Sequence, residues 1–158
     1  MIANKRLGRF EELKEAVERA EAEGKLMRVK VPRDCFERGR CRVKADSEEV
    51  IINVKGTRLD DGDVLEADKG KLVLLELREE KVLEFELSDP IEAFKLGFTI
   101  GNYHMRVMLE GNRAYISAEI GEEFLMERFK DFGPKLKEMK FRPNVELPVN
   151  VVVDFAQP

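Results

Sequence analysis

The fold of the second half of the chain is decided within residues 81–94, KVLEFELSDPIEAF, where a strand pattern changes into a helix pattern. Residues 83–87 alternate apolar and polar side chains, which is typical of a strand with one buried face. Asp89 can cap the first turn of a helix, and Pro90 fits the first helical position. Glu92 can reach back to the cap. We therefore expect a strand that is followed almost directly by a helix.

The residues that follow this junction continue the alternation of strands and helices. A Gly-Asn pair at 111–112 separates two short apolar runs, which predicts a hairpin. The expected elements are a strand at 81–87, a helix from Asp89 to Gly101, strands at 105–110 and 113–118, a helix with the apolar face Phe124, Leu125, Phe129 and Phe132, and a strand at 135–141. This β-α-β-β-α-β order predicts a ferredoxin-like domain at 81–143. A C-terminal tail at 144–158 remains, with one more strand expected at 149–155.

Residues 25–80 repeat with a period of two and predict a small all-β domain. Apolar and polar side chains alternate in several short runs, and turn residues separate these runs. The runs lie at 27–31, 41–45, 50–54 and 72–77. Strands of this length and spacing are typical of a sandwich or a barrel. The predicted fold class is therefore α+β, with the all-β domain in front of the ferredoxin-like domain.

Residues 1–24 predict an added N-terminal helix. Phe10, Leu13 and Val17 recur at helical spacing, and Gly24 lies where a helix commonly ends. We expect this amphipathic helical extension to be dispensable for metal binding, because residues 1–24 contain no His or Cys.

Composition and charge exclude several classes of protein. The chain has 158 residues with 28 Lys or Arg and 32 Asp or Glu, so its net charge is −4. A basic excess or stripe is absent from the sequence, and we expect no nucleic-acid partner. We also expect no membrane contact, because no apolar run of about 18 residues and no signal peptide are found. Cys35 and Cys41 cannot build a disulfide framework and are expected to be free thiols of a cytoplasmic protein.

Few side chains could carry chemistry. The serines lack the G-x-S-x-G context of a nucleophile, so no catalytic or cofactor-binding residue is expected, and the chain is predicted not to be an enzyme. The acidic run at 60–63 lacks the spacing of a calcium loop and is interpreted as a turn. His104 is the only histidine. One imidazole makes no useful nickel or zinc site, whereas a two-fold dimer would bring two imidazoles together.

The order of several motifs resembles that of the UreE family of urease accessory metallochaperones. The similar region covers roughly residues 25–143, and its most specific pieces are LDDGDVL at 59–65 and GNYH at 101–104. The resemblance implies a β domain similar to a chaperone's peptide-binding domain, followed by a ferredoxin-like domain that forms a homodimer. It also implies delivery of Ni²⁺ to a urease metallocentre through GTPase-containing maturation complexes.

The resemblance places the metal ligand of the family's G-N-R-H motif on His104. Tyr103 replaces the arginine of that motif, and residues 113–120 and 143–158 lack the further histidines that family members often carry. Our first hypothesis is a nickel metallochaperone that is a homodimer with His104 from each chain, and Zn²⁺ or Cu²⁺ are alternatives at the same site. Its partner would be an apo-enzyme or a maturation GTPase complex. Because neutral imidazole is the ligand, binding should weaken in mildly acidic solution.

The alternative hypothesis is a metal-free adaptor that binds an extended client segment through its β domain. A third hypothesis is an RNA-binding protein that uses the ferredoxin-like sheet. The sequence lacks the aromatic RNP pattern and has a net negative charge, and both features argue against this hypothesis.

Overall fold

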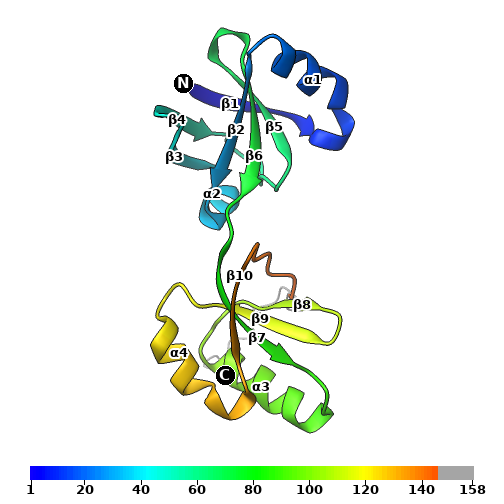
Figure 1. The fold of residues 1–158 in the computed structure, drawn as a ribbon, viewed down its shortest axis with the longest axis vertical. Helices are drawn as coiled ribbons and strands as arrows, with labels where there is room; N and C mark the ends of the chain where they lie inside the picture. The colour runs from blue at the N-terminus through cyan, green and yellow to red at the C-terminus, as the bar shows by residue number, and fades with distance from the viewer. Residues whose placement is uncertain (146–158) are drawn as a thin grey trace, which may run out of the picture. The chain divides into compact units, whose positions relative to one another are not determined.

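Figure 1 shows the computed structural model of the chain, which describes residues 1–145. The chain divides into two compact units, Met1–Glu79 and Glu80–Pro158. Each unit combines a β-sheet with helices, so the expected α+β class is confirmed. The strand expected at 149–155 lies outside the described residues. No helix within the described part of the chain is long and apolar enough to cross a membrane.

The first unit is built on a six-stranded sheet in the order β2-β6-β5-β1-β4-β3. Its elements are β1 (Ile2–Arg9), α1 (Lys14–Ala22), β2 (Leu26–Val31), α2 (Arg33–Arg38), β3 (Arg40–Ala45), β4 (Glu48–Asn53), β5 (Asp63–Ala67) and β6 (Leu72–Leu77), with short 3-10 turns at Phe10–Glu12 and Asp68–Gly70. The pairs β1–β4 and β2–β6 are parallel, and the other pairs are antiparallel. The edge strands β2 and β3 approach each other, so the sheet curls into a nearly closed barrel.

The predicted N-terminal helix is wrong for its first half. Ile2–Arg9 form β1, which lies inside the sheet between β4 and β5. Ala3 is fully buried in the barrel core. The helical pattern holds only for Lys14–Ala22, where Val17 and Ala20 are buried. Residues 1–24 therefore supply an internal strand of the sheet as well as a helix.

The first unit is also not all-β. α1 and α2 accompany its strands, and α2 occupies Arg33–Arg38, where the sequence predicted only turns. Gly39 ends α2 in the left-handed conformation, with φ of 70°. A Cβ at Gly39 would lie 2.6 Å from the Val54 carbonyl oxygen, so only glycine fits this corner.

The second unit has the predicted β-α-β-β-α-β order of elements. They are β7 (Glu80–Glu86), α3 (Pro90–Asn102), β8 (Met108–Glu110), β9 (Arg113–Ser117), α4 (Glu122–Arg128) and β10 (Lys135–Met139), with a 3-10 turn at Lys130–Phe132. The sheet order is β10-β7-β9-β8, and all neighbouring strands are antiparallel. The start of α3 is as expected, because the Ile91 backbone N–H donates to Asp89 Oδ1 at 2.9 Å.

The two faces of this sheet are covered differently. Leu83 and Phe85 point to one face, where they pack with Leu96 and Ile100 of α3 and with Phe129. The opposite face carries a smaller cluster of Val82, Met108, Tyr115 and Phe141. Phe141 comes from the segment that follows β10, so the C-terminal part of the described chain folds back over the sheet.

Candidate functional site

His104 lies immediately beyond α3 in a helix-ending motif that usually contains glycine. Its backbone N–H donates to the Gly101 carbonyl at 3.0 Å, and the Met105 N–H donates to the Ile100 carbonyl at 3.4 Å. This pair of bonds is the Schellman arrangement, with His104 at the first residue beyond the helix end. The φ of His104 is 55°. Non-glycine residues are uncommon in this left-handed region, so the backbone here favours glycine and carries a histidine instead.

The imidazole of His104 is exposed and available to bind a ligand. Within residues 1–145 it makes no hydrogen bond or ion pair with another side chain. The neighbouring Tyr103 is engaged elsewhere, since its ring packs against Phe129 at 5.8 Å between centroids. The described residues also contain no group of three or more His, Cys, Asp or Glu side chains that could hold a metal ion. A metal site at His104 therefore needs ligands from beyond residues 1–145 of one chain.

α3 leads to His104 and has an apolar face that is exposed in the described part of the chain. Ile91, Phe94 and Phe98 are 64%, 75% and 64% exposed, and they lie on one side of the helix. The Phe94 and Phe98 rings stack with 6.5 Å between centroids. Leu96 and Ile100, on the other side, are buried against the sheet. α3 is thus apolar on two faces, of which only one is used in the described structure.

The acidic run at 60–63 forms a turn with a structural role. Asp63 is buried, and both of its carboxylate oxygens lie 3.1 Å from the Arg6 guanidinium. One of these oxygens also accepts a bond from the Asp60 N–H at 2.7 Å. Asp61 accepts from the Leu77 N–H at 2.7 Å and so fixes the end of β6. These carboxylates are occupied by protein donors, which explains the turn without a metal.

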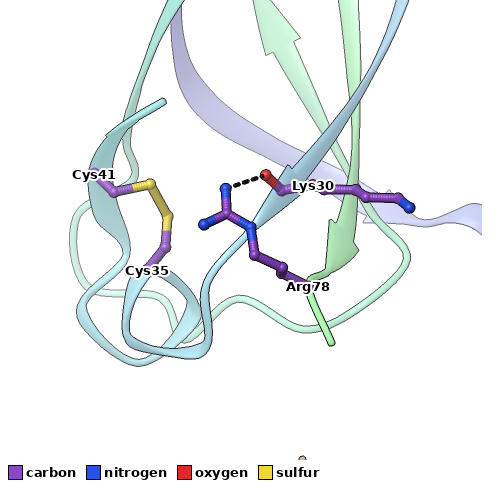
Figure 2. Close-up of a disulfide and its surroundings, with 4 residues drawn as sticks. All are labelled: Lys30, Cys35, Cys41 and Arg78. Atoms are coloured by element: carbon purple, nitrogen blue, oxygen red, sulfur yellow. Dashed lines mark hydrogen bonds between the residues drawn. A yellow bond between two sulfur atoms is a disulfide. The ribbon is translucent and has the colours of Figure 1, made fainter. Parts of the chain in front are cut away.

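The prediction of two free thiols is wrong, because Cys35 and Cys41 form a disulfide (Figure 2). Cys35 belongs to α2 and Cys41 to β3, and the reversal at Gly39 brings their Cα atoms to 5.3 Å. Beside this bridge, the Arg78 guanidinium donates to the Lys30 carbonyl of β2 at 3.4 Å. A pair of cysteines six residues apart gave no sequence signal for this pairing, since the pairing depends on a tight chain reversal.

A buried polar cluster in the second unit was missed by the sequence analysis. The Tyr115 hydroxyl donates to Glu84 Oε2 at 2.9 Å, and Lys137 Nζ lies 2.8 Å from the same oxygen. The hydrogen bond from Lys137 lowers the pKa of Glu84, although burial opposes this effect. Burial, and then the bond to Glu84, raise the pKa of Tyr115. The alternating pattern of β7 indicated Glu84 as solvent-facing, but in the structure its carboxylate is buried and lies beside Tyr115, Lys137 and Arg113.

Comparisons with known proteins identify relatives over about two thirds of this chain. A urease accessory protein UreE of Janthinobacterium sp. is 28% identical over 110 residues, which are 68% of this chain and 63% of that protein. A UreE of Burkholderia lata is 29% identical over 104 residues, which are 66% of this chain and 49% of that protein. A UreE of Burkholderia ambifaria is 33% identical over 73 residues, 46% of this chain and 36% of that protein. No family model matches the sequence.

The chain thus spans about half to two thirds of the length of the first relatives. These relatives are named accessory proteins, which agrees with the prediction that the chain is not an enzyme. Several relatives of the same name align over about two thirds of this chain, at identities near 28–29%. The chain is thus similar to UreE urease accessory proteins, from which its sequence has diverged.

Proposed function

We propose that this chain is a nickel-carrying accessory protein that acts as a homodimer and holds Ni²⁺ between two copies of His104. The relatives are named urease accessory proteins, and this name supports a role beside a nickel enzyme. Nickel is cargo in this proposal, and the protein's task is to hold it and release it. The partner would be an apo-enzyme or a maturation complex that contains a GTPase.

The observation that carries the proposal is a histidine at a position whose backbone conformation favours glycine. His104 has φ of 55°, and its side chain makes no hydrogen bond, ion pair or ring contact within the described residues. When a residue lies in an unfavourable backbone region and makes no compensating hydrogen bond or ion pair, this strain motivates a hypothesis of function. Imidazole suits Ni²⁺ better than the carboxylates that abound on this surface.

The uncovered face of α3 supports the second half of the proposal. Ile91, Phe94 and Phe98 form an exposed apolar stripe along α3, and His104 follows the C-terminal end of this helix. Contiguous apolar surface of this kind marks interaction sites in soluble proteins. A two-fold dimer that buries this stripe near its axis would set two imidazoles opposite each other. In this proposal the second unit is the ferredoxin-like dimerisation domain, and the first unit resembles a chaperone's peptide-binding domain.

The chemistry of such a site suits a carrier. Two imidazole nitrogens leave most of the nickel coordination shell to water or to the receiving protein. An incomplete shell lets an incoming ligand replace the carrier's ligands one at a time. Cu²⁺ and Zn²⁺ would be alternatives at the same nitrogens, and Cu²⁺ would bind more tightly than Ni²⁺ according to the general order of affinities.

Isothermal titration with Ni²⁺ tests the metal site. The wild-type protein should bind one Ni²⁺ per two chains, and His104→Asn should abolish this binding because asparagine tolerates the same backbone but lacks an imidazole. Glu92→Gln removes an exposed carboxylate of α3 and should leave the binding unchanged. An unchanged affinity in His104→Asn, or no binding by the wild type below millimolar Ni²⁺, would refute the carrier and leave the metal-free adaptor.

Sedimentation equilibrium tests the dimer. Phe94→Ser/Phe98→Ser should convert the protein to a monomer and weaken nickel binding. Ile120→Ser/Phe124→Ser is the matched control, because these two side chains are also exposed, at 75% and 52%, but belong to the α4 region. A wild-type monomer at tens of micromolar, or loss of the dimer only in the control, would contradict the proposed interface.

A further inference from the structure

The first unit carries a concentration of positive charge at one corner, although the whole chain is acidic. Residues 38–44 and 53–58 contain six Lys or Arg and no Asp or Glu, while the net charge of the chain is −4. All six cations are exposed. Arg42 is paired with Glu49 at 3.1 Å, and Lys44 faces the same Glu49 in the strand register. The remaining four are Arg38, Arg40, Lys55 and Arg58, which we call the basic corner.

The backbone brings the two halves of the basic corner together. Gly39, between Arg38 and Arg40, accepts a hydrogen bond at its carbonyl from the Val54 N–H at 2.7 Å. The Leu59 N–H donates to the Phe36 carbonyl at 3.2 Å. Lys55 and Arg58 are the residues next to these two donors, so the loop 55–58 lies against the end of α2.

The corner is held in a defined conformation. The Cys35–Cys41 disulfide ties α2 to β3 across Gly39. The Val54 and Thr57 carbonyl oxygens lie so close to Gly39 that no Cβ fits there. Four cations therefore stand on a preorganised piece of backbone, and preorganisation reduces the entropy lost on binding.

Within residues 1–145 none of these four cations has a carboxylate partner. The acids of α2 do not neutralise them, since Glu37 pairs with Arg33 at 3.4 Å and Asp34 lies at the start of the helix. Like charges repel one another, and an anionic partner relieves this repulsion.

We propose that the basic corner docks an acidic segment of a protein partner. Three of its four cations are arginines, whose guanidinium groups bind carboxylates through two parallel hydrogen bonds. A nucleic acid fits the corner less well, because bases stack on aromatic side chains and the two segments contain none. The acidic remainder of the chain would also repel a long phosphate backbone. The site is separate from His104, which belongs to the other unit.

Fluorescence anisotropy with a labelled decaglutamate peptide tests this proposal on the full chain. At an ionic strength of about 20 mM the wild type should bind the peptide, and Arg38→Gln/Arg58→Gln should weaken binding by about fivefold or more. Added salt to about 150 mM should weaken wild-type binding as well. Lys14→Gln/Lys69→Gln removes the same number of charges from exposed positions elsewhere in the first unit and should change the affinity by less than about twofold. Far-UV circular dichroism verifies that both variants are folded.

Two results would overturn the proposal. The first concerns the corner itself: the wild type does not bind the peptide, or both double variants lose binding equally. An equal loss would mean that net charge alone explains the binding. The second concerns the class of partner. A labelled oligothymidylate of equal charge that binds more tightly than decaglutamate, and loses this binding in Arg38→Gln/Arg58→Gln, would assign the corner to nucleic acid.

Discussion

Replacement of His104 by glycine should stabilise the second unit while it removes the proposed metal ligand. The residue has φ of 55° at the end of α3, in a motif where glycine is the usual choice. Its imidazole is exposed and makes no side-chain hydrogen bond within the described residues. The substitution therefore relieves backbone strain at almost no loss of packing.

The magnitude follows from two opposing effects. A left-handed conformation costs a non-glycine residue roughly 1–2 kcal/mol. Glycine also has more conformational freedom in the unfolded chain, and this entropy reduces the gain in folding stability by roughly 0.5–1 kcal/mol. The net stabilisation is about 1 kcal/mol. For a unit of this size, that change corresponds to a rise in Tm of about 4–8 °C.

Differential scanning calorimetry of the metal-free protein measures this shift in the transition of the second unit. Lys69→Gly is a matched control, since Lys69 is exposed, has φ of 61° and belongs to the first unit. It should raise the stability of the first unit and leave nickel binding intact. If His104→Gly lowers the Tm while Lys69→Gly raises it, the imidazole makes a structural contribution, and our reason for a functional His104 fails.

Three further predictions concern contacts inside the two units. Because the Lys137 hydrogen bond lowers the pKa of Glu84, Glu84 contributes stability at neutral pH that is lost as the pH falls below its ordinary value of 4.5 and through the depressed value. Thermal unfolding between neutral pH and pH 3 should show this loss in the wild type and a flatter dependence in Glu84→Gln; equal slopes would contradict it. Reduction of the Cys35–Cys41 disulfide by a dithiol should destabilise the first unit by about 2 kcal/mol, as expected for a short closed loop. Mass spectrometry after alkylation should find free thiols only in the reduced sample, and alkylation of the untreated protein would disprove the bridge. Gly39→Ala should cost more than about 2 kcal/mol in urea unfolding, because its Cβ would meet the Val54 carbonyl. Gly56→Ala, with φ of 72° and open space around it, should cost only about 1 kcal/mol, and equal costs would argue against the close contact at Gly39.

The second unit could be predicted because its signals are local. The helix start at Asp89 depends on one side chain and the N–H two residues later, and the structure has this bond at 2.9 Å. The turn at Gly111 depends on a single residue with positive φ. The different hydrophobic periods of strands and helices then give the order of the elements, without knowledge of which strands pair.

The first unit resisted prediction because its decisive contacts are distant in sequence. β1 is defined by pairing with β4 and β5, which begin about 46 and 61 residues after it. Its own sequence shows no clear alternation, so the helical stripe around Val17 was extended back too far. α2 was missed because its six residues are too few for a periodic signal.

The candidate site was only half visible in the sequence for a different reason. His104 could be named as the only histidine, but the apolar face of α3 was misleading. Phe94 and Phe98 have the spacing of core residues, and in the structure they are exposed while Leu96 and Ile100 are buried. A helix that is apolar on two sides does not reveal which side its own domain covers. The exposed stripe, which is the main support for a dimer, therefore needed the structure.

The two motifs that first suggested the family differ in what they say about function. The acidic motif at 59–65 is explained within the fold, because Asp63 binds Arg6 and Asp61 caps β6 through Leu77. Any protein with this barrel could keep that motif without binding a metal. His104 has no such explanation, since it occupies a glycine position and its side chain is free within the described chain. The proposed nickel site therefore depends on this single residue. His104→Asn keeps a residue that tolerates the same backbone and His104→Gly relieves the strain, and both variants should lose nickel binding.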